Sequence, residues 1–426
     1  MAADLPVSPL APKKFPKLPP IAGVTLTALA SGSRYKGRDD LLLVTMPAGT
    51  TVAGLFTTSK MPSAAVDLSR AHLSGGGANK GEARALVVNA GNANAFTGKA
   101  GAKAALATAK GAADIIGCKS EEVFVASTGV IGEDLDPQPL IAAMGQADLT
   151  KGDAKAADWQ AAARAIMTTD TFAKAATRQA KFGRETVTLN AIIKGSGMIA
   201  PDMATMLAFI FTDAALPAGV MQKLLRDANA TSLNCVTVDS DTSTSDTCLM
   251  FATGAKKITG APLRAASDKR LAPLKKALGE LMQDLAVQLA SDGEGITKLM
   301  TIEVAGAADD AAARNIALAI GNSPLVKTAV AGEDANWGRI VMAVGKSGEE
   351  AERDRLAIKI GGHAVARKGR AVAGYDERPI AKHMKGARVH IDVNVGAKGG
   401  KGKGKARIWA SDLTHGYISI NADYRS

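Results

Sequence analysis

Aromatic residues and cysteines are both scarce in this chain of 426 residues. Phe, Trp and Tyr make up 4% of the sequence. The three cysteines, Cys118, Cys235 and Cys248, include no CxxC pair, which argues against a disulfide framework and suits a reducing compartment. None of the five histidines lies at a metal-binding spacing such as HExxH, so we expect no metal site.

Long apolar runs and targeting signals are also missing. No stretch of 18 apolar residues occurs, so we expect no membrane span and no membrane partner. Residues 1–20 contain six prolines and no apolar core of a signal peptide, which predicts an extended, Pro-rich lead-in. A cytoplasmic location is the default expectation.

The net charge of +11 is concentrated near the C-terminal end. Residues 351–426 contain 16 Lys and Arg against 7 Asp and Glu, and part of this excess is the Gly/Lys-rich segment 396–407. A basic chain can bind nucleic acid, but these charges are not interleaved with aromatic residues and no known nucleic-acid module is present. We therefore predict a solvated basic hairpin loop and no nucleic-acid partner. Attraction of anionic substrates is a milder alternative.

Strand-like and helical patterns alternate along the whole chain. Strands are predicted, for example, at 39–46 and 52–59, and a long helix at 99–117. The last quarter is predicted to be rich in strands up to the alternating segment 416–424. This mixture predicts a layered α/β fold, and we find neither an internal repeat nor a clear domain boundary.

The densest motif is KGSGMIAPDMATML (194–207), a glycine loop that leads into an apolar strand. Thr205 could attack the carbonyl of Ala204, shift the peptide to an ester, and become an N-terminal threonine after water cleaves that ester. Its α-amine, with a pKa of about 7.7–8.0, would then serve as a base. On pattern alone, an ordinary loop before a core strand, with Thr205 as a β-branched strand residue, is the favoured interpretation.

Three weaker motifs contain groups that a reaction at such a threonine would need. Thr128 and Gly129 end a strand, where backbone N–H groups can stabilise an oxyanion, although a plain turn has the same pattern. Glu294, between two glycines, presents a carboxylate to an ammonium or simply follows a helix end. Asn421 and Ser426 are polar groups near the chain end. The acidic segment 239–246 does not match an EF-hand and is interpreted as a structured turn or site wall.

Together these segments closely resemble the ornithine acetyltransferase family, whose bifunctional members are also N-acetylglutamate synthases. The resemblance covers residues 21–426 and includes NAGNANAFTG, STGVIG, IMTTDT, KGSGMIAPDMATML, TVDSDTSTSDT, SDGEGITK, GEDANWGRI and NADYRS. It implies a layered mixed-sheet α/β sandwich that cuts itself between Ala204 and Thr205. The first chain would then comprise residues 21–204 after the lead-in, and the second chain residues 205–426, in a heterotetramer of two copies of each.

The resemblance also assigns roles and a reaction. Thr205 would be the nucleophile and Thr128 and Gly129 the oxyanion pair. The implied reaction moves acetyl from N2-acetylornithine to glutamate through an acetyl-threonine enzyme, in arginine biosynthesis. No cofactor is implied, although some members use acetyl-CoA as a donor. The implied substrate contacts are Thr168, Lys194, Thr205, Glu294, Asn421 and Ser426.

This sequence departs from the family pattern at a few positions. Ser240 stands where glycine is expected and Ser245 where asparagine is expected. Neither is among the site residues that the resemblance implies. Two other classes of function stay open. An N-terminal-nucleophile amidohydrolase or aminopeptidase would release free acetate, and a non-enzymatic nucleic-acid binder would show salt-dependent binding to DNA.

Overall fold

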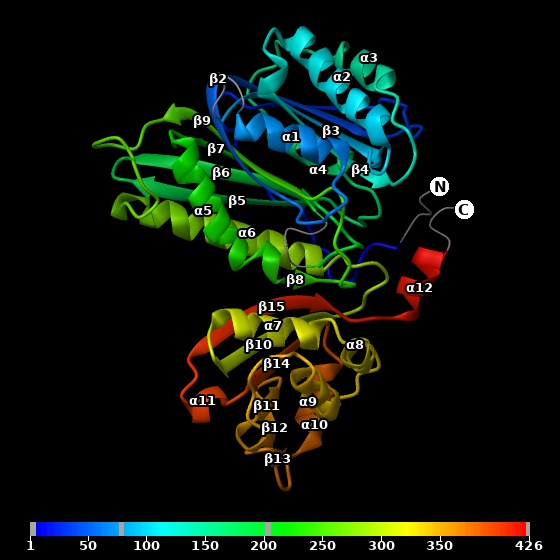
Figure 1. Cartoon of the computed structure of the whole chain (residues 1–426), viewed down its shortest axis with the longest axis vertical. Coiled ribbons are helices and arrows are strands. Elements are labelled where there is room, and N and C mark those ends of the chain that lie inside the picture. Colours follow the sequence, from blue (N-terminus) through cyan, green and yellow to red (C-terminus); the bar gives the residue numbers. More distant parts are fainter. Residues whose placement is uncertain (1–5, 76–80, 201–205, 423–426) are drawn as a thin grey trace.

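The computed structural model describes residues 6–75, 81–200 and 206–422 and arranges them in two lobes, each built around a β-sheet (Figure 1). The sheets, and the helices packed against them, confirm the predicted layered α/β fold. In these described ranges no helix is long and apolar enough to cross a membrane.

The upper lobe in Figure 1 contains an eight-stranded sheet. Its strands are β1 (Thr25–Leu29), β2 (Leu41–Phe56), β3 (Glu82–Asn92), β4 (Val123–Val130), β5 (Lys174–Phe182), β6 (Glu185–Lys194), β7 (Leu207–Ala214) and β9 (Thr247–Lys256). The order is β4-β3-β2-β9-β7-β6-β5, with β1 paired to β2. Strands β6 and β7 are antiparallel neighbours, whereas β7 and β9 run parallel.

The lower lobe contains a seven-stranded sheet. Its strands are β8 (Val236–Thr237), β10 (Leu299–Ala307), β11 (Ala357–Ile360), β12 (His363–Arg367), β13 (Arg370–Ala371), β14 (Arg388–Asn394) and β15 (Gly404–Ser411). The order is β13-β12-β11-β14-β10-β15-β8, so β10 lies between β14 and β15.

Twelve helices are described around the two sheets. They are α1 (Ala64–Ser74), α2 (Gly98–Ile116), α3 (Gln138–Met144), α4 (Ala156–Ala165), α5 (Ala218–Ala230), α6 (Ala272–Ala290), α7 (Asp310–Gly321), α8 (Pro324–Ala331), α9 (Trp337–Gly345), α10 (Glu377–Met384), α11 (Ala397–Gly400) and α12 (His415–Ala422). Short 3-10 turns lie at Ser120–Glu122, Leu233–Cys235, Lys269–Leu271 and Arg353–Arg355.

Strand β7 lies inside the first sheet and is buried along its whole length. Phe209 and Phe211 belong to the same core cluster as Trp159 of α4. Ala208 and Ile210 belong to a second cluster that includes the buried side of α6. Because successive side chains of a strand point to opposite faces, α4 and α6 cover opposite faces of the sheet.

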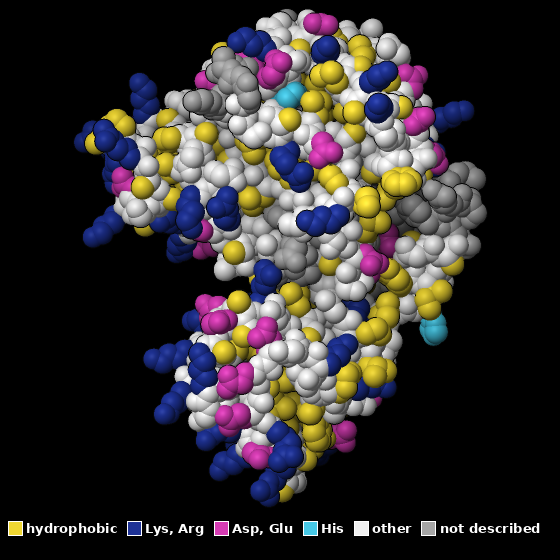
Figure 2. Space-filling model, in the orientation of Figure 1, with side chains coloured by type: hydrophobic (Ala, Val, Ile, Leu, Met, Phe, Trp, Pro, Cys, Tyr) yellow, Lys and Arg dark blue, Asp and Glu magenta, His cyan; other side chains and the backbone are white. Residues whose placement is uncertain are grey.

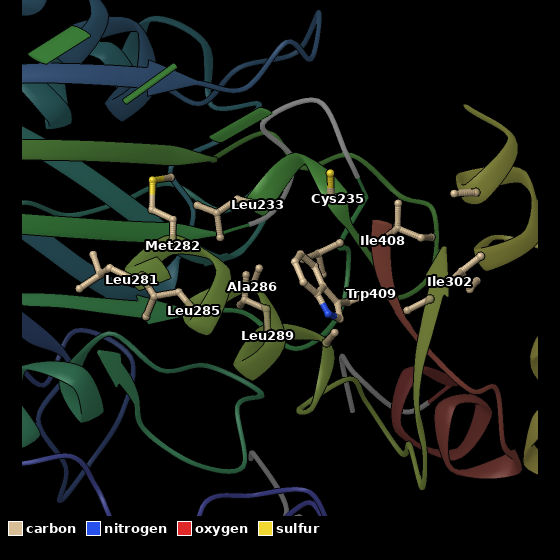
Figure 3. Close-up of a cluster of buried hydrophobic side chains, with 14 of the residues drawn as sticks. Leu233, Cys235, Leu281, Met282, Leu285, Ala286, Leu289, Ile302, Ile408 and Trp409 are labelled. Atoms are coloured by element: carbon tan, nitrogen blue, oxygen red, sulfur yellow. The ribbon is translucent and has the colours of Figure 1, made fainter. Parts of the chain in front are cut away.

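Helix α6 connects the cores of the two lobes. Leu281, Leu285 and Leu289 are spaced four residues apart, so they share one face of the helix, and all three are buried. Figure 3 shows these side chains in one cluster with Ile408 and Trp409 of β15. The seven-stranded sheet of the lower lobe is therefore joined to the upper lobe by a continuous apolar core.

Two local predictions differ from the structure. The strands predicted at 39–46 and 52–59 form the single strand β2, in which the register to β3 shifts between Thr45 and Thr50. Pro47, which lacks a backbone N–H, lies in this irregular stretch. The alternating segment 416–424, predicted as a strand, begins with helix α12 instead.

The predicted basic hairpin at 396–407 is also wrong. Its flanking strands β14 and β15 do not pair with each other, because β10 occupies the position between them. The basic charge of this lobe is accompanied by acidic side chains, as in the ion pair between Arg407 and Glu303 at 2.5 Å. Figure 2 shows Lys and Arg side chains interspersed with Asp and Glu on the visible face of the lower lobe.

We expect Phe211→Ala to reduce the free energy of unfolding by about 3–5 kcal/mol, because it empties a packed aromatic site. The Phe211 ring is fully buried, with centroids 5.5 Å from Trp159 and 5.3 Å from Phe251. Denaturant unfolding measures the change. Leu325→Ala is the control, since Leu325 is 52% exposed and should change stability by less than about 0.5 kcal/mol. Equal losses in the two variants would contradict this view of the core.

Candidate active site

A cavity of about 250 Å³ brings together the predicted site residues that the structure describes. They reach it from the end of β4, the segment between α4 and β5, the end of β6, the turn after α6, and helix α12. The predicted residues in its wall are Thr128, Gly129, Thr168, Lys194, Glu294 and Asn421. Ala204, Thr205 and Ser426 lie outside the described residues. The assigned roles of all nine residues stay predictions.

The Thr128–Gly129 corner requires glycine at its second position. Gly129 has a φ of +131°, and a Cβ there would overlap the backbone of Gly91 on the neighbouring strand. Strand β4 pairs irregularly here, because Asn92 faces both Thr128 and Val130. The end of the strand is thus turned out of its regular ladder at the point where it reaches the cavity.

Lys194 is the last residue of β6 and is buried, although it also lines the cavity. Its Nζ donates a hydrogen bond to Thr128 Oγ1 at 3.0 Å. Burial lowers the pKa of Lys194, while the nearby carboxylates of Asp170 and Asp246 oppose this change. An ammonium with this little water around it would bind strongly to an anionic group that entered the cavity.

A buried ion network behind the cavity holds three segments together. Lys174 Nζ donates to Asp170 Oδ1 at 2.6 Å and to Asp292 Oδ2 at 2.5 Å, and all three side chains are out of contact with solvent. Asp170 also accepts a hydrogen bond from the backbone N–H of Gly195 at 2.7 Å and from that of Thr168 at 3.1 Å. The network therefore fixes the backbone beside two predicted substrate contacts, Thr168 and Lys194.

The pKa values of the two carboxyl groups of this network shift in opposite directions. Burial opposes ionisation of Asp170, but the charges of Lys174 and Lys194 outweigh it and lower the pKa of Asp170 to about 2. Burial raises the pKa of Asp292, and Lys174 offsets only part of that effect. The sequence motifs did not reveal this network. The i,i+4 spacing of Asp170 and Lys174 is visible in the sequence, but Asp292 lies 118 residues beyond Lys174.

Glu294 and helix α12 form another part of the wall. Glu294 is buried, and its Oε2 accepts a hydrogen bond from Asn421 Nδ2 at 2.8 Å. Gly197 of the glycine loop packs so closely on the Glu294 carboxylate that a Cβ there would require the carboxylate to move. The helical form of the tail puts Asn421 one turn beyond Tyr417, whose carbonyl it also contacts at 3.0 Å.

The acidic segment 239–246 belongs to the same wall. Asp239 accepts hydrogen bonds from the backbone of Met198 and Ile199 at 2.6 and 2.8 Å, which anchors the glycine loop. At the other end, Asp246 Oδ1 accepts from the backbone N–H of Met206 at 2.7 Å. Residues 243–245, between these anchors, line the cavity.

A second, larger cavity of about 870 Å³ opens on the lower sheet and contains none of the predicted site residues. Within the described ranges, one group close enough to share a metal ion lies near it, formed by Glu303, His390 and Asp392. Glu303 is already paired with Arg407. His390 and Asp392 contact each other at 3.2 Å.

Comparisons with known proteins relate the whole chain to a single family. The ArgJ family model matches residues 25–426. The arginine biosynthesis bifunctional protein ArgJ of Bradyrhizobium diazoefficiens is 53% identical over 421 residues, which cover 99% of each chain. The crystal structure of ArgJ from Bacillus halodurans shares 38% identity, with a TM-score of 0.47 over 51% of this chain and 98% of that one. The ornithine acetyltransferase of Mycobacterium tuberculosis, crystallised with ornithine, shares 30% identity, with a TM-score of 0.36 over 42% of this chain and 92% of that one.

We expect Lys174→Met to reduce the free energy of unfolding by about 3–5 kcal/mol, because it leaves Asp170 and Asp292 buried without a counter-charge. Denaturant unfolding measures this loss. Lys276→Met is the matched control, since Lys276 is 77% exposed and its ion pair with Glu280 is 3.9 Å long. The free energy of unfolding of Lys276→Met should fall by less than about 1 kcal/mol. Adding Asp170→Asn and Asp292→Asn to Lys174→Met should restore part of the stability, and no recovery would show that charge is not the cause.

Proposed function

Because the chain belongs to the ArgJ family, we propose that it transfers an acetyl group from N2-acetylornithine to glutamate, yielding ornithine and N-acetylglutamate. The name of the Bradyrhizobium relative places that protein in arginine biosynthesis and calls it bifunctional. The observation that carries the proposal is the single cavity that contains Thr128, Lys194 and Glu294. These residues are far apart in the sequence, and each suits one part of an acylated amino acid.

The charges in the cavity match the part that the two substrates share. Acetylornithine and glutamate both have an α-carboxylate, which the Lys194 ammonium would bind through a charge-assisted hydrogen bond. Glu294 would accept a hydrogen bond from the α-nitrogen, which is an amide N–H in acetylornithine and an ammonium in free glutamate. Thr128 and Gly129 would stabilise the oxyanion that forms on the acetyl carbonyl. Both line the cavity at the end of β4, where the strand leaves its regular ladder.

Thr205 is the proposed nucleophile. Its Oγ1 forms a bond to the acetyl carbon while the hydroxyl proton passes to the free α-amine of Thr205. The bond from the acetyl carbon to the ornithine nitrogen then breaks, and that nitrogen takes the proton. The α-amine of glutamate next attacks the acetyl-threonine ester and restores the hydroxyl. Because one site would serve two successive half-reactions, we expect ping-pong kinetics.

The α-amine of Thr205 becomes free only if the chain is cut between Ala204 and Thr205, so cleavage is part of the proposal. The fragments would be 1–204, with its Pro-rich lead-in, and 205–426. They would stay together, because β6 of the first fragment and β7 of the second are paired neighbours in one sheet. We propose a heterotetramer of two copies of each fragment, in the cytoplasm, without a nucleic-acid partner. Acetyl-CoA is a further acetyl donor to be tested.

Thr205→Ala should abolish both cleavage and transfer, because the same hydroxyl serves both. Intact-mass analysis would show one full-length chain, and no N-acetylglutamate would form from acetylornithine and glutamate. Thr205→Ser, which keeps a hydroxyl, should retain part of both activities. Transfer at the wild-type rate by Thr205→Ala would show that the nucleophile is misassigned. Release of free acetate in place of N-acetylglutamate by the wild type would favour an N-terminal-nucleophile hydrolase.

Lys194→Ala should reduce kcat/KM for both substrates by roughly 10- to 150-fold, because both lose the same charged hydrogen bond. Lys194→Arg should restore only part of the loss, since the planar guanidinium differs in shape from an ammonium. Cleavage should be affected less, because no substrate is present at that step. Normal kcat/KM in cleaved Lys194→Ala enzyme would exclude Lys194 from substrate binding.

A further inference from the structure

The proposed reaction gives no role to a run of three hydroxyl side chains in the cavity wall. Ser243, Thr244 and Ser245 follow one another in the loop before β9, and all three line the cavity. Ser243 and Ser245 are buried and Thr244 is half-buried. These three residues therefore present neutral polar groups to a ligand.

The backbone of this loop is fixed from behind. The carbonyl of Ser243 accepts a hydrogen bond from Thr57 Oγ1 at 2.7 Å. The carbonyl of Thr244 accepts one from the backbone N–H of Ser63 at 2.8 Å. The carbonyl of Ser245 accepts one from Thr247 Oγ1 at 3.1 Å. With its carbonyls held in this way, the loop presents its side chains from a rigid support.

Two of the hydroxyls keep unused hydrogen-bonding capacity. Thr244 Oγ1 and Ser245 Oγ lie 3.3 Å apart, and either of them can be the donor of the bond between them. Among the described residues, this is the hydrogen bond that the two hydroxyl groups form. A hydroxyl offers one donor and two acceptor lone pairs, so each can still bind a ligand as donor or as acceptor.

This dual capacity meets a requirement of the proposed reaction. Both substrates have the same amino-acid head, but one ends in an ammonium and the other in a carboxylate. A fixed charge at the place where the side chain ends would attract one end and repel the other. The three hydroxyl side chains add no fixed charge to this part of the wall. Burial also raises the pKa of the adjacent Asp246 well above its usual range.

We propose that Thr244 and Ser245 are the specificity-determining residues that receive the side-chain end of either substrate. They donate hydrogen bonds to the carboxylate of glutamate and accept hydrogen bonds from the ammonium of acetylornithine. This inference rests on the proposed function, because it assigns the side-chain ends of those two substrates.

The test compares two pairs of variants of similar shape that differ in charge. Ser245→Asp relative to Ser245→Asn adds a negative charge, so the ratio of kcat/KM for glutamate to kcat/KM for acetylornithine should fall about tenfold or more. Thr244→Lys relative to Thr244→Gln adds a positive charge. The same ratio of kcat/KM values should therefore rise in Thr244→Lys. Ornithine release reports the first half-reaction and N-acetylglutamate formation the second. Damage to the fold would lower both half-reactions together.

The inference is overturned if the added charges change both substrates by the same factor. If Ser245→Asp does not fold, Ser245→Ala provides the test. Removing this hydroxyl should reduce the preference of the enzyme for glutamate over glutamine as acceptor, and an unchanged preference would also overturn the inference. A wild-type enzyme that releases no ornithine from acetylornithine would instead refute the proposed function itself.

Discussion

A lysine that is buried away from water must find compensating charge, and the candidate site is built around one such residue. Lys174 lies between the carboxylates of Asp170 and Asp292, which belong to the segment before β5 and the turn after α6. Loss of any one partner would leave uncompensated charge in a medium of low dielectric constant. The two segments are therefore held in one relative position. Asp170 extends this constraint to the glycine loop through the backbone N–H of Gly195.

The remaining walls of the cavity depend on close approaches of the backbone. Gly129 packs against Gly91, Gly197 against the carboxylate of Glu294, and Gly295 against Gly416 at the start of α12. At Gly129 and Gly295 the neighbouring backbone excludes a side chain, so these two positions bring strands, turn and helix closer than other residues would permit. Polar side chains that are distant in the sequence consequently converge on a cavity of about 250 Å³.

The strand pairing of the eight-stranded sheet would keep the fold intact after a cut between residues 204 and 205. The 204/205 bond lies in the connection between β6 and β7, and both strands are buried inside the same sheet. Strand β7 is also paired with β9 on its other side. A cut in that connection would leave the pairing and the cores on both faces of the sheet in place.

The sequence by itself predicted many of the local elements and named the candidate site residues. Helix α2 ends at Gly117, which has a φ of +74°, because glycine adopts the left-handed conformation that stops a helix. The motifs around Thr128, Lys194 and Glu294 were evident from residue type and spacing, together with the resemblance that they support. The glycine expected at position 240 also has a local reason, since Ser240 adopts a φ of +67°.

Only the tertiary structure decided which of these groups meet. The pairing of Lys174 with Asp292 spans 118 residues, and no local pattern specifies it. The segment that forms α12 packs as a helix against the turn after α6, whereas its alternating sequence favoured a strand. The insertion of β10 between β14 and β15 is likewise a matter of strand order. Periodicity and turn chemistry act over a few residues, but charge compensation and strand pairing act between surfaces that folding alone brings together.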